Sequence, residues 1–501
     1  MIVFEHVYSY TTLLIAITMV LAGSLKNSKW VKTAGYAGLA IAPLALYMEG
    51  AIDGVSLIFS TLAVIVGYSS SMYCEIYEVE KYGTRDLHIL IDLFAISVYA
   101  TFASPNVMSF IIAWFIAEIA GFFTIVYEIK PENFKAGLRY LVVSMIPADL
   151  AILAMLAYLS IDIGFLNALS IPLYELVMEV HKIPLHLSLI IITGFSAKAA
   201  IVPLHFWLPD AHSLAPAPAS SILSGIMVKM GLYGILRILP LIEETYSTIV
   251  FLILGSLSAI YGGLLAIAQI DIKRILAYST IENTGLMLIV LMRYKLISDP
   301  IPYYGFYTLL AAHALYKSAL FMNSGTVEVL THTRDITKLG FLSKVAPLSA
   351  TSALLAVFSL IGVPPTIGFI AKLLLIESTV SLLVTSIITG LLLTIVVIIA
   401  SALTIIYSIK YLTIYWGLWS VRKGLKINPS ETLLVKWELM PSALGVSVSL
   451  LVPVITGWGA SIQIMLSLIF ALTMFVLITT YMYSRMKRIT HDSAWLGGEY
   501  P

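Results

Sequence analysis

The sequence predicts an all-α, multi-pass membrane protein with about 14–15 transmembrane helices, arranged as two inverted five-helix repeats that each contain a broken helix. Its 501 residues are 59% hydrophobic and only 11% charged, whereas a soluble domain carries roughly 25% charged residues. Apolar runs of about 20 residues, long enough to cross about 30 Å of hydrocarbon, recur from Tyr8 almost to the C-terminus. Prolines interrupt two of these runs. The composition excludes an ordinary cytosolic enzyme, and a net charge of +1 gives no indication of nucleic-acid binding.

The apolar runs define about fifteen spans, which start near residues 8, 31, 54, 87, 106, 137, 184, 216, 246, 273, 302, 346, 380, 440 and 461. With these spans, the loops on one side hold most of the lysines and arginines, among them Lys32 and Lys273. The opposite loops hold only Lys182, Arg237, Arg293 and Lys295. Because positively charged residues favour the cytoplasmic side, we expect a cell-membrane protein with its N-terminus outside and its C-terminus in the cytoplasm.

The two interrupted runs are the seventh and the twelfth. The seventh, GFSAKAAIVPLHFWLPDAHSLAPAPAS, contains Pro203 and Pro209, and the twelfth, FSLIGVPPTIGFIAKLLLIES, contains Pro364 and Pro365. Each proline removes a backbone donor and clashes with the preceding turn, so we expect both helices to break at membrane depth. Such a break is tolerated only inside protein or beside a water-filled cavity.

The two breaks lie five spans apart, and each has a lysine nearby, Lys198 or Lys372. A repeat with an odd number of spans places its second copy upside down, and paired broken helices in inverted halves are typical of a transport pathway. Glu118 in the fifth span is then matched by Glu282 in the tenth. The predicted parts are a three-helix segment (1–85), a first five-helix repeat (86–240), a second repeat (241–415), and C-terminal helices with a short cytoplasmic tail (416–501).

Four lysines fall deep inside the predicted spans: Lys198, Lys229, Lys317 and Lys372. A charged side chain at the bilayer centre costs at least roughly 2.5–3.5 kcal/mol, so these lysines need partners, water or neutralisation. Burial disfavours the charged amine, whereas a nearby carboxylate favours it, and a lysine between these two effects can load and release a proton. One such lysine is explained equally well as a structural residue bonded to carbonyls, but four make that explanation weak.

Together with nearby acidic residues and a histidine, these lysines form a predicted series of proton carriers, called the proton file below. Glu118, in AWFIAEIAGFF, is the expected ion-pair partner of Lys198. His313 and Lys317 are four residues apart and share one helical face, where they are expected to form a polar stripe with Glu282. Waters have to bridge the file, which in order is Glu118, Lys198, Lys229, His313, Lys317 and Lys372.

Four further polar residues are weaker candidates. His205, Asp210 and His212 could act as ligands or proton relays, with His205 the best of the three. The favoured role of Asp210, however, is to cap the helix that starts near Pro216. Asp149, in SMIPADLAIL, is expected to form a polar contact between helices and ranks below Glu118.

The sequence predicts no metal and no other cofactor on this chain. The HxxxK spacing of His313 and Lys317 is not a metal signature, because a protonatable lysine is a poor ligand and no third donor is placed. The single cysteine, Cys74, excludes a cysteine-ligated cluster within one chain. There is no phosphate loop, and no GxGxxG follows a strand and opens a helix. Any nicotinamide, flavin or iron–sulfur centre is therefore expected on other chains.

The segment FSAKAAIVPLHFWLPDAHSLAPAPASSILSGIMVKMGLYGILR closely resembles spans seven and eight of the proton-conducting antiporter-like family. That family comprises the large membrane subunits of respiratory complex I, of membrane-bound hydrogenases and of Mrp-type cation/proton antiporters. DIKRILAYSTIENTGLML, HALYKSALFMNSG and GVPPTIGFIAKLLLI match it as well, so that the resemblance covers roughly residues 87 to 415. The tail ending HDSAWLGGEYP leaves no room for the lateral helix of the most distal complex I subunit.

The resemblance implies roles for individual residues and two inverted five-helix repeats. Glu118 matches the family's fifth-span glutamate, Lys198 its seventh-span lysine, and Lys229 the eighth-span lysine that links two half-channels. Lys372 matches the twelfth-span position, and the eleventh-span polar pair is matched by His313 and Lys317. Glu282 departs from the pattern, because many members have histidine there, which leaves the protonation order of the second half-channel open.

The predicted function is that of a proton-translocating, antiporter-like membrane subunit of a redox-driven pump, complex I-like or membrane-bound hydrogenase-like. The alternative is a subunit of an Mrp-type sodium/proton antiporter, since Glu118, Asp149 and Glu282 suit either ion. A passive scaffold gains nothing from buried lysines, and a metabolite carrier usually shows a cavity of mixed polar and aromatic residues. The expected partners are other membrane subunits, including antiporter-like homologues, a redox or hydrogenase arm, the lipid bilayer, and protons or sodium ions.

Overall fold

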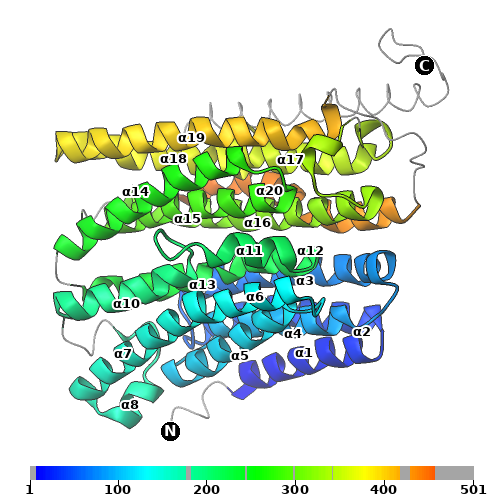
Figure 1. Ribbon diagram of the computed structural model, residues 1–501. Helices are drawn as coiled ribbons and strands as arrows, with labels where there is room; N and C mark the ends of the chain where they lie inside the picture. Colours follow the sequence, from blue (N-terminus) through cyan, green and yellow to red (C-terminus); the bar gives the residue numbers. More distant parts are fainter. Residues whose placement is uncertain are drawn as a thin grey trace.

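The computed structural model describes residues 7–176, 182–242, 245–296, 300–340, 342–417 and 429–456. Within these residues the helices are joined by turns and loops, and the only β-structure is isolated bridges. Nine of the described helices are long and apolar enough to cross a membrane, and four shorter apolar helices accompany them. The predicted class, an all-α multi-pass membrane fold, is confirmed. Figure 1 shows the helices lying roughly along one direction, with the N-terminal helices on one side of the bundle and α14 to α20 on the other.

The N-terminal part begins with a tight helical hairpin. A Cβ at Gly35 would lie 2.6 Å from the backbone nitrogen of Val20, so only glycine lets α1 and α2 approach this closely. Asp53 caps α3 by accepting a hydrogen bond of 3.0 Å from the amide of Ser56. The helices here are α1 (Val7–Leu25), α2 (Lys29–Met48), α3 (Gly54–Tyr82) and α4 (Leu87–Phe102).

Two spans of the next part contain a π-helical turn, a feature often found at functional sites. The first turn joins α6 to α7, and the second separates α12 from α13 and ends just before Lys229. The elements are α5 (Val107–Ile125), α6 (Pro131–Tyr140), the π-turn Leu141–Met145, α7 (Ile146–Ile163), α8 (Phe165–Ser170), α10 (Leu185–Lys198), α11 (Trp207–Leu214), α12 (Ala217–Ile222), the π-turn Leu223–Met227, α13 (Lys229–Ile238) and the 3₁₀ turn Leu239–Leu241.

The remaining described helices surround the long helix α16, which packs against α3, α12, α15, α17, α18 and α20. They are α14 (Thr245–Ala268), α15 (Ile272–Leu296), α16 (Pro300–Thr331), α17 (Pro347–Ile361), α18 (Ile367–Val380), α19 (Ile387–Trp416) and α20 (Pro429–Thr456). Short 3₁₀ turns are Ile336–Lys338, Leu342–Lys344 and Ser381–Val384.

The two predicted helix breaks are present. Helix α10 ends at Lys198 and α11 begins at Trp207, with Pro203 in the segment between them. Helices α17 and α18 are separated by residues 362–366, which include Pro364 and Pro365. Pro209, in contrast, lies inside α11, in its first turn.

Helices begin within several residues of each predicted start from 8 to 380, and the start near 440 falls inside α20. The predicted span near 461 lies outside the described residues.

Burial separates central helices from helices at the lipid face. The apolar windows of Ala217–Leu241 and Ile272–Leu296 are 94% buried, whereas that of α19 is 33% buried. Ile388, Leu392 and Ile398 of α19 are exposed, as expected of a surface that meets lipid. Polar side chains in the middle of α13 and α15 are therefore buried within the protein.

Candidate functional site

The expected ion pair between Glu118 and Lys198 is present. Nζ of Lys198, the last residue of α10, lies 2.7 Å from Oε1 of Glu118 in α5 and donates to the Tyr140 hydroxyl at 3.0 Å. Both charged side chains are fully enclosed. The ammonium also lies over the rings of Trp114 and Tyr140, at 5.7 and 4.9 Å from their centroids. Hydrogen bonding and cation–π contact together hold one buried charge pair.

A third ionisable group adjoins this pair. Asp149, in the first turn of α7, interacts electrostatically with both Glu118 and Lys198. The contact between helices that the sequence predicted for Asp149 therefore includes the carboxyl group of Glu118 itself.

Lys229 pairs with His313 at the centre of the molecule. Nζ of Lys229 lies 2.6 Å from Nδ1 of His313 in α16 and donates to the carbonyl of Ser224 at 2.6 Å. Ser224 belongs to the π-turn that precedes Lys229, so the local backbone supplies the acceptor. Neither side chain is exposed to solvent. At this distance one nitrogen must accept while the other donates, so the pair shares a proton rather than carrying two charges.

The other residues of the predicted stripe have different partners. Lys317 of α16 donates to the carbonyl of Leu276 at 2.9 Å and contacts the Ser279 hydroxyl, both in α15. Glu282, also in α15, accepts from Thr404 at 2.7 Å and from Tyr407 at 2.5 Å, both in α19. The expected stripe of His313, Lys317 and Glu282 is therefore split, because each side chain is bonded to a different neighbouring helix.

Lys372 lies beside the second helix break. Its Cδ atom would be 2.9 Å from a Cβ placed on Gly362, whose φ of +88° suits glycine. Its ammonium has no hydrogen-bond partner, and Glu282 is the carboxylate whose charge acts on it. The second half thus places a glutamate and a lysine near each other without the direct contact seen in the first half.

The two histidines among the weaker candidates have different surroundings. His205 lies in the segment between α10 and α11, partly exposed, with its ring 4.8 Å from that of Tyr261. His212 is fully buried, stacks on Phe321 at 4.7 Å, and has no partner at either ring nitrogen. Its buried position places His212, more than His205, among the central charged groups, since Lys317, Lys273 and Lys229 all act on it.

The capping role predicted for Asp210 is wrong. Helix α12 begins without a side-chain cap, and Asp210 lies within α11. Its carboxylate instead forms ion pairs with Arg139 and with Arg274, the latter at 2.6 Å. Two guanidinium groups from α6 and α15 outcompete a local backbone amide, because a charge-assisted hydrogen bond is roughly twice as strong as a neutral one.

The prediction that Lys32 and Lys273 lie in loops is also wrong. Each is 1% exposed and belongs to the first turns of α2 or α15. Nζ of Lys32 lies 2.5 Å from Oε1 of Glu75 and 3.3 Å from Oδ2 of the buried Asp92. Both lysines are near helix ends, where counting positive charges along the sequence cannot separate a loop residue from a buried one.

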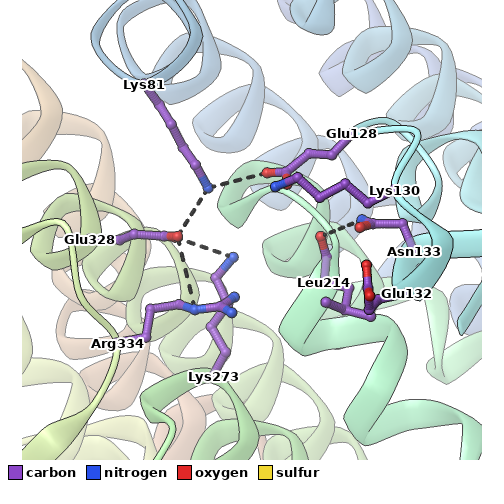
Figure 2. Close-up of a pocket in the computed structure, with 9 residues that line it drawn as sticks. All are labelled: Lys81, Glu128, Lys130, Glu132, Asn133, Leu214, Lys273, Glu328 and Arg334. Carbon is purple, nitrogen blue, oxygen red and sulfur yellow. Dashed lines mark hydrogen bonds and ion pairs between the residues drawn. The ribbon is translucent and has the colours of Figure 1, made fainter.

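Lys273 opens onto a charged pocket of about 230 Å³ that the sequence did not reveal. Figure 2 shows Lys81 pointing into it between Glu128 and Glu328. Oε1 of Glu328 lies 3.1 Å from Nζ of Lys81 and 3.9 Å from Nε of Arg334. The other carboxylate oxygen, Oε2, lies 3.7 Å from Nζ of Lys273. The other residues that line the pocket are Lys130, Glu132, Asn133 and Leu214.

Glu128, just after the end of α5, is stabilised in its ionised form by its neighbours in this pocket. Burial opposes ionisation, but hydrogen bonds from Lys130 and Tyr82 and the charge of Lys81 hold the pKa of Glu128 below its usual range. A carboxylate whose pKa is lowered on folding adds stability above its unfolded pKa, and that contribution is lost as the pH falls through the lowered value.

Replacing Glu328 with glutamine is expected to destabilise the protein, because it leaves three cations without their shared carboxylate. The expected loss in the free energy of unfolding is roughly 1–3 kcal/mol. Glu132→Gln is a matched control at the exposed rim of the same pocket, with an expected change within about 0.5 kcal/mol. Thermal unfolding of the detergent-solubilised protein measures both. Equal melting temperatures for the two variants would contradict the central role of Glu328.

The chain matches the family described as "NADH:quinone oxidoreductase/Mrp antiporter, TM" over residues 104–404. It is 31% identical over 350 residues to hydrogenase-4 component B of Escherichia coli, covering 66% of this chain and 50% of that protein. It is 28% identical over 497 residues to the putative antiporter subunit mnhA2 of Staphylococcus saprophyticus, covering 90% of this chain and 61% of that protein. The chain thus spans about half the length of the first of these relatives.

The fold also resembles a solved structure. A chain of the membrane-bound sulfane sulfur reductase, an archaeal respiratory membrane complex, superposes with a TM-score of 0.73 at 22% identity. The superposition covers 88% of this chain and 76% of the other. At this identity the likeness concerns the fold alone.

Proposed function

This chain belongs to the NADH:quinone oxidoreductase/Mrp antiporter transmembrane family, and from that premise we propose that it moves protons across the membrane as a subunit of a redox-driven complex. The observation that carries the proposal is the enclosed ion pair of Glu118 and Lys198, together with a second buried pair, Lys229 and His313. Burying such charges is expensive, and a chain that served only as a scaffold would gain nothing from them.

In the proposed mechanism, the partner's reaction moves Glu118 relative to Lys198. Separation of the two leaves the buried ammonium without its counter-charge, which favours release of its proton. Closure of the pair favours reloading. Tyr140, bonded to the amine, holds Lys198 in position during both steps. In this mechanism the charge of Lys198 changes the proton affinity of Lys229 and His313, which can pass one proton between them.

We assign residues 86–240 and 241–415 to two half-channels of opposite orientation, with the N-terminus outside the cell and the C-terminus in the cytoplasm. In support, each half has a buried glutamate on its second helix, Glu118 on α5 and Glu282 on α15, and a lysine beside its broken helix. Lys317, Glu282 and Lys372 carry protons through the second half. The partners are other membrane subunits and a redox or hydrogenase arm, which supplies any cofactor and all bond chemistry.

A sodium/proton antiporter subunit is the second candidate, because one relative carries the name of an antiporter subunit. The carboxylates Glu118, Asp149 and Glu282 are oxygen ligands that suit either ion.

The test starts from the complex purified through a tag on this chain, whose neighbours are then identified. The purified complex is reconstituted in vesicles, and lumen pH is followed with and without sodium ions. We expect a redox-active neighbour and pH changes that depend on its electron donor and not on sodium. Strict dependence on sodium, with no redox partner, would replace the first candidate with the second.

A further inference from the structure

A further buried carboxyl group lies in α20, outside the residues that match the family. Glu438 is 0% exposed and was not among the residues that the sequence singled out. Its Oε2 accepts a hydrogen bond from Thr326 at 2.8 Å, and its Oε1 accepts from Asn323 at 3.1 Å, both in α16. The hydroxyls of Ser349 and Ser352 in α17 also face this carboxyl group.

No lysine, arginine or histidine among the described residues forms an ion pair with Glu438. The titratable groups that face it are tyrosines: Tyr73 of α3, which contacts Thr326 at 3.2 Å, and Tyr411 and Tyr415 of α19. Helix α18 packs against the other end of α20, around Leu450. An isolated carboxylate buried among neutral groups is too costly to remain ionised and neutralises instead. Burial thus favours the protonated form of Glu438, whereas the hydrogen bonds donated by Thr326 and Asn323 favour its ionised form. This balance makes Glu438 a candidate for binding and releasing a proton.

One face of α19 connects this region to the second half of the proton file. Tyr407, Tyr411 and Tyr415 recur every four residues and so lie above one another on the helix. Tyr407 donates to Glu282 at 2.5 Å, at one end of the series.

At the other end of the series, Asn323 orients two tyrosine hydroxyls. Its Oδ1 accepts from Tyr411 at 2.8 Å, and its Nδ2 donates to Tyr415 at 2.8 Å. The Tyr415 hydroxyl also lies 2.8 Å from Ser349 Oγ, which faces Glu438. These hydrogen bonds lead from Glu438 to Tyr411, and Tyr407, one helical turn away on α19, leads on to Glu282.

We propose that Glu438 is a proton-binding site that exchanges protons with Glu282 along the tyrosine face of α19. In each step a hydroxyl oxygen receives one proton and gives up another, so that only Glu438 and Glu282 change charge. The steps between successive tyrosines span one helical turn and use a bridging water. This inference rests on the proposed function, since the proton that reaches Glu282 continues along the same file.

The first test detects the proton itself. Infrared difference spectra of the intact complex, recorded across a pH titration, should show the C=O stretch of a protonated carboxyl group that disappears in Glu438→Gln. An unchanged spectrum in Glu438→Gln would overturn the proposal. Loss of the band from the unsubstituted protein on adding sodium ions would also overturn it, because the carboxyl group would then bind sodium.

The second test measures transport in vesicles that contain the intact complex. Glu438→Gln and Tyr411→Phe should each slow proton movement roughly 2- to 10-fold, and the double variant should be no slower than the worse single variant. Tyr99→Phe is the matched control, since Tyr99 is buried and its hydroxyl has no hydrogen-bond partner. Full transport by both single variants would overturn the proposed connection.

Lys198→Met is measured in parallel to separate the two proposals. If Lys198→Met stops transport while Glu438→Gln does not, only the further inference fails. If Lys198→Met transports normally, the proposed function fails, whereas the infrared band still decides whether Glu438 binds a proton.

Discussion

Replacing Lys198 with methionine is expected to abolish coupled proton movement while the complex still assembles. The substitution keeps an unbranched side chain and removes the amine that binds Glu118 and Tyr140. The expected loss is at least tenfold, which corresponds to about 1.4 kcal/mol or more in the rate-limiting barrier. This loss is measured as proton movement in vesicles, together with turnover of the driving reaction. Lys26→Met, at an exposed loop position, is the control and should behave as the unsubstituted chain.

Stability gives an independent check on the same pair. Removing one partner of a buried ion pair costs roughly 3–5 kcal/mol, because the other charge is left uncompensated. The double variant Lys198→Met, Glu118→Gln contains neither charge and should regain most of that stability without regaining transport. If the double variant transported protons, Lys198 and Glu118 would be structural residues, and the proposed mechanism would be wrong.

Replacing Lys229 with methionine, or His313 with leucine, is expected to reduce proton movement by a similar, at least tenfold, factor. The two side chains share a proton across 2.6 Å, so either substitution removes one end of the same transfer. Because they act as a unit, the double variant should be little worse than either single one.

Lys410→Met is the matched control for Lys229. This lysine also donates to backbone carbonyls, those of Ile267 and Gln269, but lies near the end of α19 and away from the file. Its loss should lower the melting temperature and leave transport per assembled complex unchanged. If Lys229→Met resembled Lys410→Met in both measurements, Lys229 would have only a structural role.

Much of this arrangement was predictable from the sequence, because the membrane leaves few alternatives. Apolar runs fix the spans, and a proline removes a helical hydrogen bond, so breaks near Pro203 and Pro364 were expected. Pro209 shows the limit of this rule, because it lies in the first turn of α11, where proline is tolerated. Glu118 and Lys198 each lie in an apolar span, and pairing offsets the cost of burying both charges, which predicted their contact.

Contacts between distant segments were less predictable. Lys229 and His313 are 84 residues apart, and packing of the π-turn Leu223–Met227, just before Lys229, on α16 brings them together. The partners of Asp210 come from α6 and α15, so a local capping argument could not find them. Glu438 belongs to no sequence motif, and only the structure shows the neutral groups that four other helices place around it.

Water between the lysines decides whether the proton file is a continuous pathway. No direct hydrogen bond joins Lys198 to Lys229, or Lys317 to Lys372, so protons need water to cross these intervals. An electron cryo-microscopy map of the intact complex that resolves water would show it. We predict ordered waters that link the four lysines into one hydrated route. Lysines separated only by apolar side chains, with no water between them, would contradict the account.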